Sequence, residues 1–260
     1  MRTPDLLYGI HPPIDTNTLA MWPLDEGTGT VAADIINGRN VNRGGGITWN
    51  DALIGKAANI NAMGGGMEDT TTAAGTDASA LQGEWSCEVW VNVTAAAAGD
   101  IIQYSNKSGS AAADNIQLTI SQNANLTFLV GWQNAGVFSQ NTTAKLRVGV
   151  WQHIAVTKQN FSGTFQVKTY LNGKLDNTVS TVAPPTSGSS GRWYIGTGKT
   201  GHFRGSICSA HVTTSVLTQS QIRESWRRGM LWSPSQYVIR LMSKYPVQPY
   251  SCSDPYMITA

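Results

Sequence analysis

Two carboxylates four residues apart are the first side chains that could do chemistry. Glu84 and Glu88 lie at the start of an alternating segment, residues 85–93, and paired carboxylates carry out glycoside hydrolysis. Residues four apart in a strand lie roughly 13 Å apart along the backbone, whereas a retaining pair needs about 5.5 Å between its carboxyl groups. Ser86 stands between them, so no third acid separates their pKa values. Catalysis is not expected here. The hydrolase alternative predicts polysaccharide cleavage that Glu84→Gln and Glu88→Gln abolish.

A second candidate site combines an indole with neutral amides. Trp132 is followed by Gln133 and Asn134 between two short strand segments. A sugar ring can stack on an exposed indole while amide groups exchange hydrogen bonds with its hydroxyls. Trp132, Gln133 and Asn134 are therefore the predicted ligand-binding residues. The alternative is a turn whose tryptophan covers the edge of a sheet.

Composition argues against several classes of function. The chain has 260 residues, 41% of them hydrophobic, which is enough for one sizeable core. Only 13% are charged and the net charge is +2, so no nucleic acid or anionic membrane is expected as a partner. No segment approaches the roughly 20 apolar residues of a spanning helix. The first residues lack the apolar core of a secretory signal, so synthesis in the cytoplasm is expected.

Alternating apolar segments separated by turn residues predict an antiparallel β-structure. Asn172 and Gly173 form a strong signal for a two-residue hairpin turn. Residues 68–80 are small and polar and indicate a loop. The expected strands span residues 19–24, 85–93, 101–104, 116–120, 126–132, 151–158, 165–171, 193–195 and 202–212.

One helix is predicted near the end of the chain, over residues 219–228. Thr218 is a good N-cap, and Gln221 completes a capping box with it. Gly229 is well placed to end the helix. The segments at either end, residues 1–17 and 231–260, are rich in proline and have no sustained period, so we interpret them as arms.

Four stretches of sequence along the middle of the chain carry recognisable motifs. They are LAMWPLDEGTG at 19–29, WSCEVWV at 85–91, WQHIAVT at 151–157 with YLNGK at 170–174, and FRGSI at 203–207 followed by LTQSQI at 217–222. In these motifs and in their order, the chain resembles the laminin-G-like, or concanavalin A-like, jelly-roll domains from about residue 18 to residue 230. The resemblance implies an all-β fold, an antiparallel two-sheet jelly-roll sandwich with one short C-terminal helix, to which this chain adds extended terminal arms. It says much less about function.

The fold gives several side chains a structural interpretation. Trp22, Trp90, Trp151 and Phe165 are candidate core aromatics. His153 lies in an apolar strand, so a packed, hydrogen-bonded histidine is favoured over a catalytic one. Three cysteines, at 87, 208 and 252, lack metal-ligand spacing and are expected to be reduced.

The resemblance also implies a calcium site near the opening turn. Asp34 and Asn37, with Gly38, match the first part of such a site, and oxygen ligands suit a hard cation. The closing strand carries no aspartate at 208–210, where the family usually has one or two. An Asx turn at Asp34 is the alternative. No cofactor is therefore expected, although weak calcium binding stays open.

Together these features predict three segments: an N-terminal arm (1–17), a jelly-roll domain (18–230) and a C-terminal arm (231–260). The family's glucanases carry an E-x-D-x-E pattern whose middle acid is Ser86 here, so we expect binding and not an enzyme. The hypothesis is a structural or adhesion protein of a larger assembly, most specifically a phage-type virion component at the virion surface. Its arms would contact neighbouring subunits, and its domain would contact surface glycans. The alternatives are a free lectin and a jelly-roll glucanase.

Overall fold

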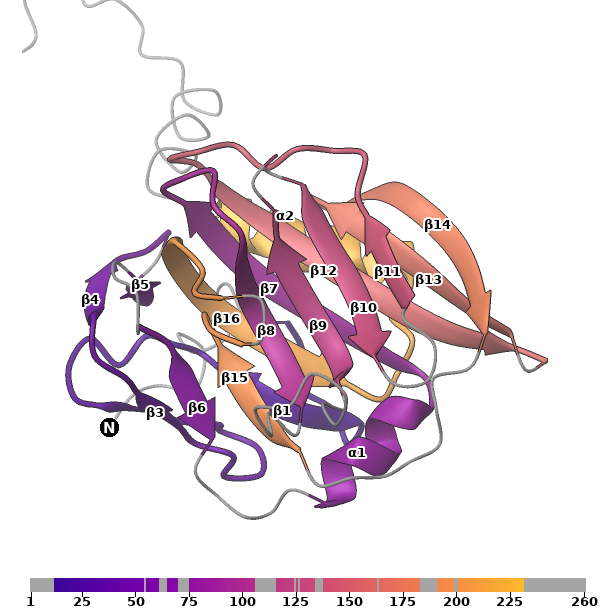
Figure 1. Ribbon diagram of the computed structural model, residues 1–260, viewed down its shortest axis with the longest axis horizontal. Coiled ribbons are helices and arrows are strands. Elements are labelled where there is room, and N and C mark those ends of the chain that lie inside the picture. Colours follow the sequence, from indigo (N-terminus) through magenta and orange to yellow (C-terminus); the bar gives the residue numbers. More distant parts are fainter. Residues whose placement is uncertain are drawn as a thin grey trace, which may run out of the picture.

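The fold is an antiparallel β-sandwich of two eight-stranded sheets, as predicted (Figure 1). This computed structural model describes residues 12–53, 55–60, 65–69, 75–105, 116–123, 125, 127–133, 138–162, 164–182, 191–198 and 201–231. Within these ranges no helix is long and apolar enough to cross a membrane.

The first sheet, sheet A, contains the long strands and supports the C-terminal helix. Its order is β14 (Lys174–Val182), β13 (Thr164–Leu171), β12 (Trp151–Phe161), β7 (Trp85–Val93), β16 (Gly205–Thr213), β5 (Lys56–Ile60) and β4 (Ile47–Asp51), with β1 (Thr18–Trp22) also paired to β16. Asn172 and Gly173 join β13 to β14, both with positive φ, 53° and 72°. That is the two-residue hairpin turn which the sequence predicts.

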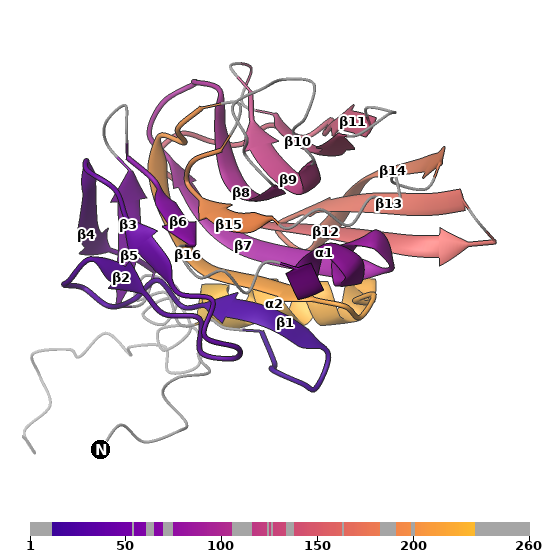
Figure 2. The same cartoon turned by 60° about the horizontal axis from the view of Figure 1, so that its bottom comes forward.

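The second sheet, sheet B, packs face to face on sheet A (Figure 2). Its order is β11 (Phe138–Asn141), β10 (Phe128–Gln133), β9 (Ile116–Gln122), β8 (Gly99–Ser105), β15 (Arg192–Ile195), β6 (Met67–Asp69), β3 (Val41–Arg43) and β2 (Val31–Ala32). Strand β15, from late in the chain, therefore lies between β8 and β6, from its first half.

The core lies between the two sheets and is built by alternation along the strands. On β7, Cys87, Val89, Val91 and Val93 are fully buried on the inner face. Trp193 of sheet B contacts Trp22 of sheet A with ring centroids 5.2 Å apart, and contacts Tyr104 at 5.0 Å. The prediction of core aromatics is confirmed, because Trp22, Trp90 and Phe165 are buried and Trp151 packs against the core while partly exposed.

Both described cysteines are free and buried. Cys87 and Cys208 are fully enclosed, and burial raises the pKa of each thiol well above its ordinary value. Such thiols are inert and structural, which agrees with the prediction for these two residues.

Two helices flank the sandwich within the described ranges, where the sequence analysis predicted one. Helix α1 (Gly75–Gln82) and strand β6 both overlap residues 68–80, so the loop prediction was wrong for those parts of the segment. Lys158 donates to the carbonyls of Leu81 and Gln82 at 2.7 and 3.1 Å, at the end of α1. A lysine there satisfies carbonyls that the helix leaves without partners, which explains how a weakly amphipathic helix is held.

Helix α2 (Gln219–Leu231) is longer than predicted, because Gly229 does not end it. A Cβ on Gly229 would lie 2.2 Å from the Trp90 ring of β7. Glycine is needed at this position for close approach of the helix to the sheet, and not as a helix stop.

Candidate functional site

Helix α2 covers the outer face of sheet A and creates the first candidate site. The capping box is confirmed: the Thr218 N–H donates to Gln221 Oε1 at 2.9 Å, and the Gln221 N–H donates to Thr218 Oγ1 at 3.3 Å. This start directs Ile222 onto Ala155 and Tyr170 of the sheet, where Ile222 is fully buried. The helix is thereby held over the middle of β7.

Beneath α2 lies a buried carboxylate between two histidines. Glu88 Oε1 is 3.4 Å from His153 Nε2 on β12, and Glu88 Oε2 is 3.7 Å from His211 Nδ1 on β16. The Ser225 hydroxyl of α2 donates to Glu88 Oε2 at 3.4 Å. All four side chains are buried. This group, called the Glu88 cluster below, therefore connects strands β7, β12 and β16 to helix α2.

A bulge in β16 brings His211 into the Glu88 cluster. Cys208 pairs with Trp90, but the register then shifts so that His211, and not Ala210, lies opposite Glu88. Ser209 between them has φ of 51°. A bulge re-aims the side chains that follow it. Sequence alternation alone could not find this contact, because it gives no sign of the extra residue.

Burial controls the charge of His153. It lowers the pKa of this imidazole, while the neighbouring Glu88 carboxylate raises it by a smaller amount. Trp90 also packs on the ring, with centroids 5.1 Å apart. The expectation of a packed histidine is confirmed. The expected hydrogen bonding of its ring is not found at Nδ1, which has no partner within the described residues, whereas the backbone N–H donates to Asn172 Oδ1 at 2.9 Å.

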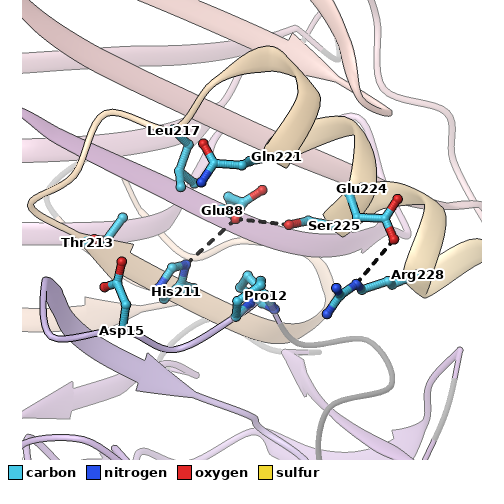
Figure 3. Close-up of a pocket in the computed structure, with 11 residues that line it drawn as sticks. Pro12, Asp15, Glu88, His211, Thr213, Leu217, Gln221, Glu224, Ser225 and Arg228 are labelled. Carbon is cyan, nitrogen blue, oxygen red and sulfur yellow. Dashed lines mark hydrogen bonds and ion pairs between the residues drawn. The ribbon is translucent and has the colours of Figure 1, made fainter.

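A pocket of about 220 Å³ opens beside the Glu88 cluster. Figure 3 shows Glu88 facing His211 and Ser225, with Glu224 and Arg228 of α2 paired along one side. Glu88 and His211 form its deepest polar part, since both are nearly inaccessible to solvent. The lining residues are Pro12, Pro13, Asp15, Glu88, His211, Thr213, Leu217, Gln221, Glu224, Ser225 and Arg228.

The outer face of sheet B carries a different set of polar groups, called the sheet B polar row below. Cross-strand pairing places Asn42, Glu68, Tyr194 and Gln103 side by side across β3, β6, β15 and β8. Next along β9, Thr119 pairs with Gln103 and its hydroxyl accepts from the amide at 3.5 Å. Neutral amides and hydroxyls therefore cross most of this sheet.

Part of the sheet B polar row is open to solvent. Arg192 donates to Glu68 Oε1 at 3.0 Å, and the two side chains are 46% and 43% exposed. The buried Tyr194 hydroxyl lies 3.5 Å from the same oxygen. Burial, followed by the charge of Glu68, raises the tyrosine pKa to about 12. Sequence reasoning missed this group because it assigned Glu68 to a loop, although alternation within residues 192–195 separates Arg192 and Tyr194 from the core.

The predicted sugar-binding residues lie at one end of the same sheet. Trp132 and Gln133 are the last residues of β10, and Trp132 pairs with Phe138 of β11. Asn134 lies outside the described residues. The prediction of this site therefore stays a prediction.

The predicted calcium residues form a turn. Asp34 accepts hydrogen bonds from the backbone N–H groups of Met21, Ile36, Asn37 and Arg39 at 2.9–3.1 Å. The Asn37 amide donates to the Leu19 carbonyl. The structure favours the Asx turn, because both carboxylate oxygens already have donors. The described ranges hold no cluster of three or more His, Cys, Asp or Glu suited to a metal ion.

The two glutamates that suggested hydrolysis have separate surroundings. Glu84 is exposed ahead of β7, and its Oε1 accepts from the Asn160 N–H at 2.9 Å. Glu88 is buried beneath α2. The fold therefore does not present them as an open pair.

Comparison with solved structures identifies several proteins of the same fold. Sialidase from Trypanosoma rangeli, in complex with sialic acid, is 13% identical with a TM-score of 0.59, covering 90% of this chain and 37% of that one. Domain 4 of AbnA, a GH43 extracellular arabinanase from Geobacillus stearothermophilus, in complex with arabinotriose, is 20% identical with a TM-score of 0.58, covering 80% and 98%. The botulinum neurotoxin type G receptor binding domain is 14% identical with a TM-score of 0.57, covering 82% and 51%.

These similarities correct one expectation. The chain spans only about a third of the sialidase, and identities this low establish the fold alone. Nevertheless, sialidases and an arabinanase domain are among the proteins that share the fold. The prediction that this chain is not an enzyme rested on the fold and on the missing central acid. It was wrong, because the same sandwich occurs in glycoside hydrolases.

The family is established by the sequence itself. No curated protein is similar to the chain. The model of the laminin-G-like domain, described as the concanavalin A-like lectin/glucanases superfamily, matches residues 64–223. That range includes Glu88, His153 and His211, the sheet B polar row except Asn42, and most strands of both sheets. This chain therefore belongs to the concanavalin A-like lectin/glucanase superfamily.

Proposed function

We propose that the domain binds carbohydrate on the outer face of sheet B. The observation that carries the proposal is the exposed Glu68–Arg192 pair beside Tyr194 and Asn42. Ligand sites need a few placed polar groups that fix orientation. A carboxylate accepts from sugar hydroxyls, and a guanidinium donates to them in a planar fork. Both groups remain half exposed while paired, so each retains hydrogen-bonding capacity toward a ligand.

Domain 4 of the arabinanase AbnA supports this assignment. It is matched over nearly its full length and was solved with arabinotriose. A neutral oligosaccharide also fits the low charge of this chain, and the exposed Asn42 supplies an amide beside Glu68. Trp132, Gln133 and Asn134, at the β10 end of the sheet, are the proposed second contact region.

A glycan array followed by titration calorimetry tests the proposal. Arg192→Ala and Glu68→Ala should each weaken binding to the best oligosaccharide by about tenfold or more. The matched control is Lys56→Ala, which removes an exposed ion pair between neighbouring strands of sheet A, Lys56 Nζ to Asp51 Oδ1 at 2.7 Å. That variant should bind like the wild type.

The proposal fails if no glycan is retained, or if Lys56→Ala loses as much affinity as Arg192→Ala. Trp132→Ala then locates the ligand along the sheet. A loss confined to Trp132→Ala would move the site to the β10–β11 hairpin and away from Glu68.

The narrower hypothesis of a virion component depends on the arms, most of which lie outside the described residues. The described part of the N-terminal arm contacts its own domain: the Asn17 carbonyl accepts from Thr213 Oγ1 and the Thr214 N–H at 3.0 and 2.9 Å. Assembly with other subunits stays a prediction, and light scattering of the full chain in solution tests it.

A further inference from the structure

Two imidazoles and one carboxylate are enclosed between helix α2 and sheet A. Glu88 Oε1 is 3.4 Å from His153 Nε2, and Glu88 Oε2 is 3.7 Å from His211 Nδ1. All three side chains are at most 2% exposed. Because one carboxylate balances one imidazolium, a second protonated histidine would leave an uncompensated buried charge, which is costly. The closed arrangement therefore resists protonation of both histidines.

The side chains around the two imidazoles add no second buried anion within the described residues. The titratable and charged ones on the elements packed there are Asp15 before β1, Tyr170 on β13, Cys208 on β16, and Arg223, Glu224, Arg227 and Arg228 on α2. Burial raises the pKa of both Tyr170 and Cys208, so these two stay neutral. Asp15 is exposed, and the half-exposed Glu224 is paired with Arg228 at 3.4 Å. A second imidazolium therefore has no buried partner.

The direction of the pH effect follows from the histidine closest to Glu88. Burial lowers the pKa of His153 by more than the Glu88 carboxylate raises it. A histidine released into water titrates near about 6.5. Below that pH an open state binds a proton that the closed state does not, so the closed state loses stability as the pH falls. Above that pH its stability is fully present.

Helix α2 is the element that can separate from the rest of the fold. Ile222 packs with Ala155 and Tyr170 in a small apolar cluster apart from the core between the sheets. Strands β7, β12 and β16, in contrast, are each hydrogen-bonded to a neighbouring strand on both sides. Elements with few buried contacts open before the core does. The contact between α2 and sheet A is therefore expected to open while the sandwich stays folded.

We propose that α2 is a pH-dependent latch: protonation of both imidazoles of the Glu88 cluster releases the helix from sheet A. The latch is closed in neutral solution and opens in moderately acid solution. Opening exposes the apolar side chains of Ile222, Ala155 and Tyr170, which α2 and the sheet bury against each other. The proposed carbohydrate surface is on the opposite sheet, so the two proposals stand or fall separately.

Hydrogen–deuterium exchange of the full chain, read by mass spectrometry, measures the opening. Samples at pH 7.5 and 5.5 lie about one unit on either side of the ordinary histidine pKa of about 6.5. After scaling for the intrinsic exchange rate, protection of α2 should fall about tenfold for each histidine that the closed state keeps neutral. Protection of β7 and β12 should stay the same. Unchanged protection of α2, or an equal loss in α2 and both strands, would overturn the proposal.

Substitution of the histidines assigns the effect to the Glu88 cluster. The double variant His153→Gln/His211→Gln lacks both titrating groups, so its α2 should be equally protected at the two pH values. The matched control is His202→Gln, which removes the histidine 3.0 Å from Thr197 Oγ1 and should keep the pH dependence of the wild type. A double variant that keeps this dependence would contradict the latch.

NMR titration of the wild-type imidazoles keeps the proposal testable if the double variant does not fold. Protonation of His153 and His211 should coincide with the loss of protection in α2. If both imidazoles titrate near about pH 6.5 while α2 stays protected, the closed structure accepts both charges and the proposal is wrong.

Discussion

The two outer faces of the sandwich place the same kinds of side chain in opposite environments. On sheet A, α2 encloses Glu88 with His153 and His211, and the carboxylate is 1% exposed. On sheet B, Glu68 pairs with Arg192 and both stay nearly half exposed. The difference is that helix α2 covers the outer face of sheet A, as Figures 1 and 2 show. A buried carboxylate is held in place by its protein partners. An exposed carboxylate can instead exchange its protein partner for a ligand.

The largest expected effect is on the packing of the enclosed face. Trp90→Ala should lower the free energy of unfolding by about 3–5 kcal/mol, because it opens a cavity between β7, His153 and Gly229. Urea denaturation measures the loss. Trp49→Ala, at a partly buried indole on the edge strand β4, should cost clearly less. Equal losses would mean that the face beneath α2 is packed no more tightly than the sheet edge.

A smaller effect compares one substitution on both faces. Glu88→Ala should cost about 1–3 kcal/mol, because it removes the acceptor of the buried Ser225 hydroxyl and the neighbour of His153. Glu68→Ala should cost less than about 1 kcal/mol, because it breaks an exposed pair. Thermal or urea unfolding of the two variants checks this. The contrast between the faces would be refuted by a Glu68 variant as unstable as the Glu88 variant.

The smallest expected effect is the change in the free energy of unfolding per pH unit that arises from Lys158, the buried lysine of sheet A. Burial lowers the pKa of Lys158 to about 7 from its ordinary 10.5, so between these values the unfolded chain binds a proton that the folded chain does not. The free energy of unfolding should therefore rise with pH through this window, by at most about 1.4 kcal/mol per unit, and be lowest below pH 7. The difference between wild type and Lys158→Met, measured by urea unfolding from pH 7 to 10, should follow this slope. A constant difference would indicate that the carbonyls of Leu81 and Gln82 keep the lysine charged in the folded state.

Local signals in the sequence predicted most of the fold. Alternation placed β7, β12, β13 and β16, and the capping box located the start of α2. These predictions succeeded because strand period, turn chemistry and helix caps depend on residues close together in the chain. The segment 68–80 was missed because small polar residues carry no clear period, and β6 and α1 are held there by distant partners such as Tyr194 and Lys158.

The sequence by itself determined a β-sandwich of this superfamily, its hairpin at Asn172 and Gly173, and its core tryptophans, because those features follow from period, turn residues and apolar bulk. Only the tertiary structure decided which acids matter. The bulge at Ser209 set His211 opposite Glu88, the close approach at Gly229 brought α2 over them, and pairing of β6 with β15 joined Glu68 to Arg192. Such contacts join residues that are far apart in the chain, by 124 positions in the case of Glu68 and Arg192. No local sequence pattern predicts a shift of register or the burial of one particular acid.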